Sequence, residues 1–139
     1  MKAQKKGNLV FGRIEKGEEI ITTFKEICKL HDIKSGFING LGAAEDVQIA
    51  YYNVETKQYE HKQLSGDFEI VSLSGTISVF DNEPHIHLHI ALSDADFNMI
   101  GGHLDHALVS LTCEFMINGF DAEIQRKLDT ETGLNLLDF

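Results

Sequence analysis

Residues 71–79 read Val-Ser-Leu-Ser-Gly-Thr-Ile-Ser-Val, and residues 84–90 read Pro-His-Ile-His-Leu-His-Ile. In each stretch aliphatic residues alternate with hydroxyl residues or histidines, and Gly75 is the one interruption. Successive side chains of a β-strand point to opposite sides of the sheet, so a period of two predicts a strand with one apolar and one polar face. We therefore expect two strands, each with one face in the core.

The segments around these two strands predict a fold with a single helix. Further apolar runs that are typical of strands cover residues 9–14, 33–41, 47–54 and 107–117. Ile20, Phe24 and Ile27 recur at helical spacing, which predicts one amphipathic helix of about three to four turns. Glycines at 36, 40 and 42 predict that the strand from residue 33 ends in a tight turn or bulge. The expected class is α+β, a mainly antiparallel β-sheet packed with one principal N-terminal helix.

Length and composition favour a single domain over residues 1–139, with residues 1–7 as a flexible terminus. The 139 residues suffice for one core, and 42% of them are hydrophobic. Cys28 and Cys113 are too far apart in the sequence for a Cys-x-x-Cys motif, and we expect two buried free thiols. No stretch has the length of a membrane span or the pattern of a signal peptide, which predicts a cytoplasmic protein without a membrane partner.

The charge of the chain argues against nucleic acid as a partner. Asp and Glu number 22 against 12 Lys and Arg, so the net charge is −10. Affinity for duplex DNA comes largely from basic side chains that neutralise phosphates. The only local basic cluster is Lys2, Lys5 and Lys6. We therefore do not expect this chain to bind DNA.

Four histidines form the candidate chemical site: His85, His87, His89 and His103. Alternate residues of a strand lie on one face about 6.5 to 7 Å apart, so two of the first three imidazoles can converge on one ion. His103 can supply a third ligand if the turn at residues 93–98 folds its segment back antiparallel. A three-histidine site leaves one coordination position open. The expected cofactor is a divalent transition metal, with zinc as the first choice.

Some features are open to more than one interpretation. The histidines also fit partly exposed strand residues that hydrogen-bond to their neighbours without a metal. The hydroxyl face from Ser72 to Ser78 fits a solvated sheet face, a face covered by a partner, or the lining of a cavity. Glu69 and Glu114 are acid/base candidates only if they face the histidines. Asp94 is expected to hydrogen-bond the backbone of its own turn.

Four stretches together resemble the plants and prokaryotes conserved (PPC) domain. They read GFINGLGAAEDVQIAYY (36–52), GDFEIVSLSGTIS (66–78), PHIHLHIALSD (84–94) and IGGHL (100–104). The resemblance implies one helix on a mainly antiparallel sheet and assembly into homotrimers. It also implies that His87, His89 and His103 match the histidines that hold a metal in some prokaryotic relatives, with His85 as an alternative ligand.

The chain also departs from the family pattern. Free-standing prokaryotic members carry a DNA-binding label because the plant proteins place this domain after AT-hook motifs, and no AT-hook is present here. Asp67 stands where the family's partner-contact stretch has arginine, and Phe97 stands in a turn that usually contains glycine.

Together these features predict a homotrimeric PPC-domain protein with a histidine-based divalent metal site and a small-molecule ligand at that metal. Its biological activity is not identified by the sequence. The alternatives are a metal-dependent enzyme that uses the open metal position, and a DNA-binding protein.

Overall fold

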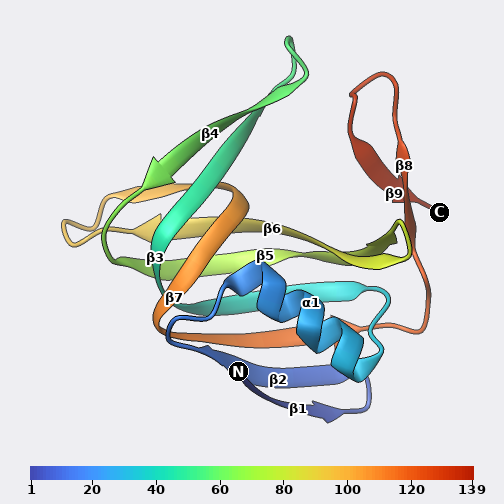
Figure 1. The fold of residues 1–139 in the computed structure, drawn as a ribbon, viewed down its shortest axis with the longest axis horizontal. Coiled ribbons are helices and arrows are strands. Elements are labelled where there is room, and N and C mark those ends of the chain that lie inside the picture. The colour runs from blue at the N-terminus through green and yellow to red at the C-terminus, as the bar shows by residue number, and fades with distance from the viewer.

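The computed structural model describes all of residues 1–139, which form one helix and nine strands (Figure 1). The elements in chain order are β1 (Lys2–Lys6), β2 (Leu9–Glu15), α1 (Ile20–His31), β3 (Gly36–Asn53), β4 (Gln58–Leu64), β5 (Phe68–Phe80), β6 (Glu83–Ser93), β7 (Met99–Gly119), β8 (Gln125–Leu128) and β9 (Asn135–Asp138). All strand pairs are antiparallel except β5 with β8. The predicted class, a mainly antiparallel sheet with one helix, is confirmed.

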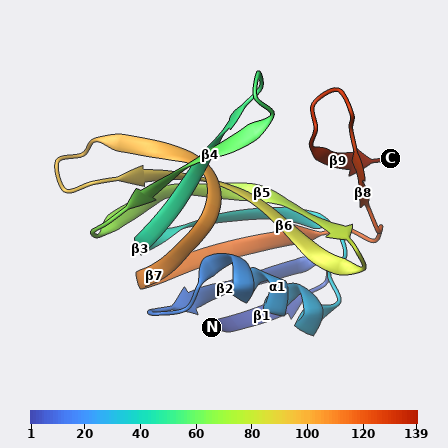
Figure 2. The ribbon, with the colours of Figure 1, turned by 45° about the horizontal axis from the view of Figure 1, so that its top comes forward.

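Four strands close on one another through their hydrogen bonds. β7 pairs with both β3 and β6, and β5 pairs with the same two strands. β2 and β1 extend the sheet from β7, whereas β4 adds to the C-terminal part of β3 and β8 adds to β5. Figure 2 shows that the β3–β4 and β8–β9 hairpins rise on the side of the molecule away from α1.

The helix α1 begins where Glu19 caps it. The Glu19 carboxylate accepts hydrogen bonds from the backbone N–H groups of Ile21 at 3.0 Å and Thr22 at 2.7 Å, which satisfies donors that have no partner inside the helix. Phe24 lies on the buried face and packs edge-on against Phe115 of β7, with ring centroids 5.1 Å apart. The helix has 12 residues, and no helix of the fold is long and apolar enough to span a membrane.

The core includes the apolar faces of both strands that the sequence singled out. Leu73 of β5 and Leu88 of β6 are fully buried in one cluster with the residues of α1. Cys28 and Cys113 belong to the same cluster as free thiols, as expected. Burial raises the pKa of both thiols to about 12, which makes them poor nucleophiles.

The segment from residue 33 to residue 54 differs from the expectation of two separate strands. β3 runs from Gly36 to Asn53, and its pairing with β7 shifts register between Gly42 and Ala44. The glycines therefore mark bulges that bend one long strand. Gly42 has a φ of 152°, and a Cβ there would lie 2.0 Å from the carbonyl oxygen of Thr112.

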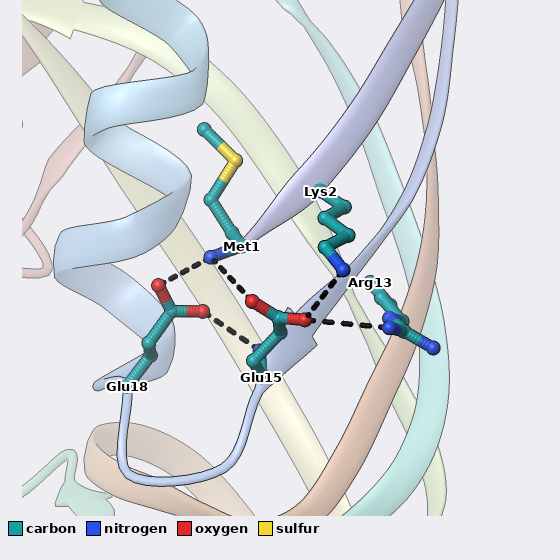
Figure 3. Close-up of polar contacts among 5 residues, drawn as sticks. All are labelled: Met1, Lys2, Arg13, Glu15 and Glu18. Atoms are coloured by element: carbon teal, nitrogen blue, oxygen red, sulfur yellow. Dashed lines mark hydrogen bonds and ion pairs between the residues drawn. The ribbon is translucent and has the colours of Figure 1, made fainter.

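The expectation of a flexible terminus at residues 1–7 is also corrected, because β1 pairs with β2 along its whole length. Figure 3 shows the polar contacts that fasten this edge. The amino group of Met1 donates a hydrogen bond to Glu18 and lies 3.8 Å from a carboxylate oxygen of Glu15. The guanidinium of Arg13 lies 3.3 Å from the other oxygen of Glu15. Exposed ion pairs are weak individually, so the backbone ladder does most to order the strand.

Candidate metal centre

The hairpin between β6 and β7 places the fourth histidine beside the first three. Asp94 stabilises the turn, since its Oδ1 accepts hydrogen bonds from the backbone N–H groups of Asp96 and Asn98, both at 2.9 Å. Phe97 adopts the left-handed conformation, with φ 63°, that glycine adopts at lower cost. β7 then returns antiparallel to β6 and sets His103 directly opposite His89.

The paired glycines before His103, Gly101 and Gly102, permit a close approach between backbones. A Cβ at Gly101 would lie 2.3 Å from the carbonyl oxygen of Ile90, and one at Gly102 would lie 2.8 Å from that of Ala50. The first contact is with β6 and the second with β3. The glycines thus allow β7 to pack against both neighbouring strands immediately before it presents His103.

Three imidazoles converge where these strands meet. One nitrogen from each of His87, His89 and His103 lies within 4.8 Å of the others. The ring centroids are 5.3 Å apart for His87 and His89, 5.1 Å for His87 and His103, and 5.6 Å for His89 and His103. Three nitrogens at this separation can bind one ion at the usual distance of about 2.0 to 2.1 Å after small side-chain rotations.

The surroundings of His103 fit a metal ligand. Its Nδ1 is buried and has no hydrogen-bond partner, an arrangement that proteins rarely leave uncompensated. Its Nε2 lies on the other side of the ring, 3.8 Å from a carboxylate oxygen of Asp105. Ligating histidines commonly direct their second nitrogen toward a carboxylate, which orients the ring. The other oxygen of Asp105 lies 2.7 Å from Nδ1 of His61.

The electrostatics of the cluster favour neutral imidazoles. Burial lowers the pKa of His87 to about 4, and the neighbouring His103 acts in the same direction. Burial also lowers the pKa of His103, while Asp105 opposes that shift. A neutral imidazole keeps the lone pair that a metal requires, so these two side chains are ready to act as ligands at neutral pH. The donor set therefore fits a divalent transition metal.

The remaining histidines lie outside this cluster. His85 packs edge-on against Phe80, with ring centroids 6.1 Å apart, and burial lowers its pKa to about 4. His106 lies between two carboxylates of other elements, 3.6 Å from Asp46 and 3.9 Å from Glu19. The alternative ligand suggested by the sequence, His85, is therefore not one of the three converging imidazoles.

The hydroxyl face of β5 lies on the same side of the sheet as the histidines. Thr76 is opposite His87 in the β5–β6 register, and Ser78 is opposite His85. Arg126 of β8 covers one end of this row, since its Nε donates a hydrogen bond to Ser78 Oγ at 2.8 Å and its Nη2 donates one to Thr76 Oγ1 at 3.4 Å. Ser72, at the other end, is exposed in the single chain. Cover by a side chain of the same chain was not among the three interpretations of this face.

Tyr59 of β4 stands beside the cluster. Its ring lies 5.0 Å from that of His103, centroid to centroid. The hairpin that carries it is fastened to the β8–β9 hairpin, because the Tyr52 hydroxyl donates to the carbonyl oxygen of Thr132 at 2.6 Å. Lys57 donates to the carbonyl oxygen of Thr130 at 3.2 Å. The two hairpins therefore hold Tyr59 and β8 in fixed positions near the histidines.

Sequence reasoning missed three residues around this centre: Tyr59, Asp105 and Arg126. No periodic pattern singles them out, because their roles depend on strand pairings distant in the sequence. The two glutamates that remained open as acid/base candidates lie elsewhere. Glu69 is opposite Ser93 and Glu114 is opposite Arg13, and neither belongs to the converging group.

Comparison with known proteins identifies the family. The model of the Plants and Prokaryotes Conserved (PCC) domain, the family also written PPC, matches residues 1–121. The chain therefore belongs to this family, as its sequence stretches and histidine pattern indicate. A search of curated proteins gave no match.

Solved structures from bacteria and archaea share the fold. A candidate DNA-binding protein from Bacteroides thetaiotaomicron is 33% identical with a TM-score of 0.95, and the match covers 99% of this chain and 96% of that one. A PPC protein from Pyrococcus horikoshii is 32% identical with a TM-score of 0.87, over 99% and 94% of the two chains. A metal-containing protein from Archaeoglobus fulgidus is 32% identical with a TM-score of 0.89, over 96% and 94%.

Proposed function

We propose that this PPC-domain protein binds one divalent transition metal, with zinc as the first choice, through His87, His89 and His103. The observation that carries the proposal is the convergence of three imidazole nitrogens within 4.8 Å. The buried Nδ1 of His103, which has no other partner, supports it. The relative from Archaeoglobus fulgidus is described as metal-containing, which agrees with a metal in this fold.

Metal content tests the proposal. Purified untagged protein is stripped with a chelator, exposed to zinc, freed of excess ion on a desalting column and analysed by plasma mass spectrometry. We expect one zinc per chain in the unmutated protein and none in His89→Ala. His106→Ala is the matched control and should retain the ion, because His106 lies outside the cluster. Full occupancy in His89→Ala, or none in the unmutated protein, would contradict the site.

A metal-dependent enzyme is the second candidate function. The converging group contains only three ligands, and a tetrahedral ion held by three histidines keeps a position for water or a small-molecule ligand. When bound, such an ion supplies Lewis-acid chemistry. The side chains of this chain that could act beside it are Tyr59 and Arg126, which lie near the histidines on separate hairpins. A screen of the zinc-loaded protein for hydrolase and oxygenase activity separates this function from simple metal binding.

A homotrimer is the expected assembly. An exposed apolar patch on β2, β3 and β7 supports a homotrimer. Its residues Phe11, Leu41 and Met116 are 65%, 57% and 40% exposed. They line a shallow hollow of about 280 Å³, and exposed apolar patches often mark contacts between proteins. Light scattering should give three times the chain mass of 15.6 kDa, and Phe11→Ser should weaken the assembly. A monomer at all concentrations would contradict the homotrimer.

The cytoplasm remains the compartment that the sequence predicts.

DNA binding is the third candidate, since one relative is described as a candidate DNA-binding protein. The net charge of −10 opposes it, because a polyanion gains little from an acidic surface. We expect no mobility shift of A·T-rich duplex at physiological salt. Sub-micromolar, sequence-selective binding there would contradict this expectation.

A further inference from the structure

The two arginines of the chain have different surroundings. Arg13 is exposed and lies 3.3 Å from a carboxylate oxygen of Glu15. Arg126 is partly buried, and its three hydrogen bonds go to uncharged oxygens: Ser78 Oγ at 2.8 Å, the carbonyl oxygen of Asn135 at 2.8 Å and Thr76 Oγ1 at 3.4 Å. Arg126 makes no ion pair within the chain. A guanidinium that is partly withdrawn from water without a counter-ion is costly, so this one is available to an anion.

The hydrogen bonds of Arg126 leave two of its five donors free. A guanidinium has five N–H groups, and the three recorded bonds occupy one each on Nε, Nη1 and Nη2. One N–H on each terminal nitrogen remains free to donate to an oxygen of a carboxylate or phosphate. Thr76, which orients Nη2, lies opposite His87 on the same sheet face, so the guanidinium stands next to the histidine cluster.

The charges around Arg126 also favour an anion. The two side chains that hold its guanidinium, Thr76 and Ser78, lie opposite His87 and His85 in the β5–β6 register. No carboxylate is among the groups that shift the pKa of Arg126 itself, which burial lowers. In a chain of net charge −10, a divalent ion beside this guanidinium would create a local positive region that attracts anions.

We propose that Arg126, held by Thr76 and Ser78, forms an anion-binding subsite beside the three histidines. Its ligand is a small organic anion that places a carboxylate or phosphate on the guanidinium and another donor atom near the metal position. The ring of Tyr59 stands beside the same centre, 5.0 Å from that of His103. The subsite rests on the proposed metal site, because the histidines provide its second half.

The experiment is calorimetric titration of the zinc-loaded protein with sodium acetate and, separately, with sodium phosphate at matched ionic strength. Arg126→Gln is compared with Lys127→Gln, which removes the same charge at the adjacent, exposed residue of β8. We expect Arg126→Gln to weaken binding of the preferred anion by about tenfold or more, since a hydrogen bond to a charged group is lost. Lys127→Gln should leave it within about twofold, as expected for a screened surface charge. Comparing acetate with phosphate identifies the anionic group.

Two measurements separate failure of the subsite from failure of the metal site or of folding. Zinc content, measured on every variant, should stay at one per chain in Arg126→Gln. If Arg126→Gln proves unstable, Arg126→Lys takes its place in the titration. This variant preserves the charge but not the forked donor geometry, so it should lose part of the affinity for the anion. Three results would overturn the subsite while zinc binding stands. Arg126→Gln could bind the anion as tightly as the unmutated protein, Lys127→Gln could weaken binding as much as Arg126→Gln, or neither anion could bind. Absence of zinc from the unmutated protein would overturn the metal site itself.

Discussion

On one face of β6, Ile86, Leu88 and Ile90 have 7%, 0% and 3% of their surface exposed, whereas His87 on the opposite face is half-buried and His89 is exposed. The aliphatic face packs in the core with α1, and the histidine face lies on the side of His103 and of Thr76, the residue that Arg126 contacts. Because alternate residues of one strand serve these two faces, neighbouring substitutions should have separable effects. The aliphatic face should control stability, and the histidine face should control ligand binding.

The largest effect on stability should come from the aliphatic face. Leu88→Ala removes a side chain that is fully buried and leaves a cavity, so the free energy of unfolding should fall by about 2 to 5 kcal/mol. Urea denaturation of the metal-free protein measures this loss. A loss below about 1 kcal/mol would mean that the core on this side can collapse around the deletion, and the contrast between the two faces would weaken.

A smaller effect should follow from the protonation of His87. In the unfolded chain its pKa is about 6.5, whereas burial lowers it to about 4 in the folded protein. Between these values the unfolded state binds a proton that the folded state does not, so the free energy of unfolding falls as the pH drops from about 6.5 to about 4. Thermal unfolding of the metal-free protein at several pH values measures this decline. His87→Gln should reduce the decline without abolishing it, because burial also lowers the pKa of His85 to about 4 and that of His103. An unchanged pH profile in that variant would contradict the assignment.

The smallest effect on stability should come from substitution of His89, although the same substitution should abolish metal binding. His89 is exposed, so His89→Ala should change the free energy of unfolding of the metal-free protein by about 0.5 kcal/mol or less. The same variant should lose the extra stability that zinc gives the unmutated protein, because ligand binding stabilises only the folded state. Urea denaturation with and without zinc gives both values. A large loss without zinc would show that the histidine face also supports the fold.

The sequence predicted the elements in which apolar residues recur at a regular spacing and form a buried face. The helix, β5, β6 and β7 follow their apolar periods, and the turn around Asp94 brings His103 opposite His89 as expected. β4 was not predicted, because it pairs only with β3 and all but two of its residues are exposed, so its sequence shows no alternation.

The missed parts of the centre share a physical cause. Arg126 lies near the histidines only because the chain continues past β7 and adds β8 parallel to β5, and its contact with Ser78 spans 48 positions of sequence. Tyr59 likewise depends on the long, bent β3, which the glycines were expected to interrupt. Pairings of this kind are set by tertiary structure, and a short sequence window contains no sign of them.

The most direct test of the account is the position of the metal. Crystals of the metal-free protein soaked in zinc should give an anomalous difference peak at the zinc absorption edge. We predict one strong peak per chain, bound by nitrogens of His87, His89 and His103 at about 2.0 to 2.1 Å. A peak held by other residues, or no peak at these three histidines despite full exposure to zinc, would contradict the account.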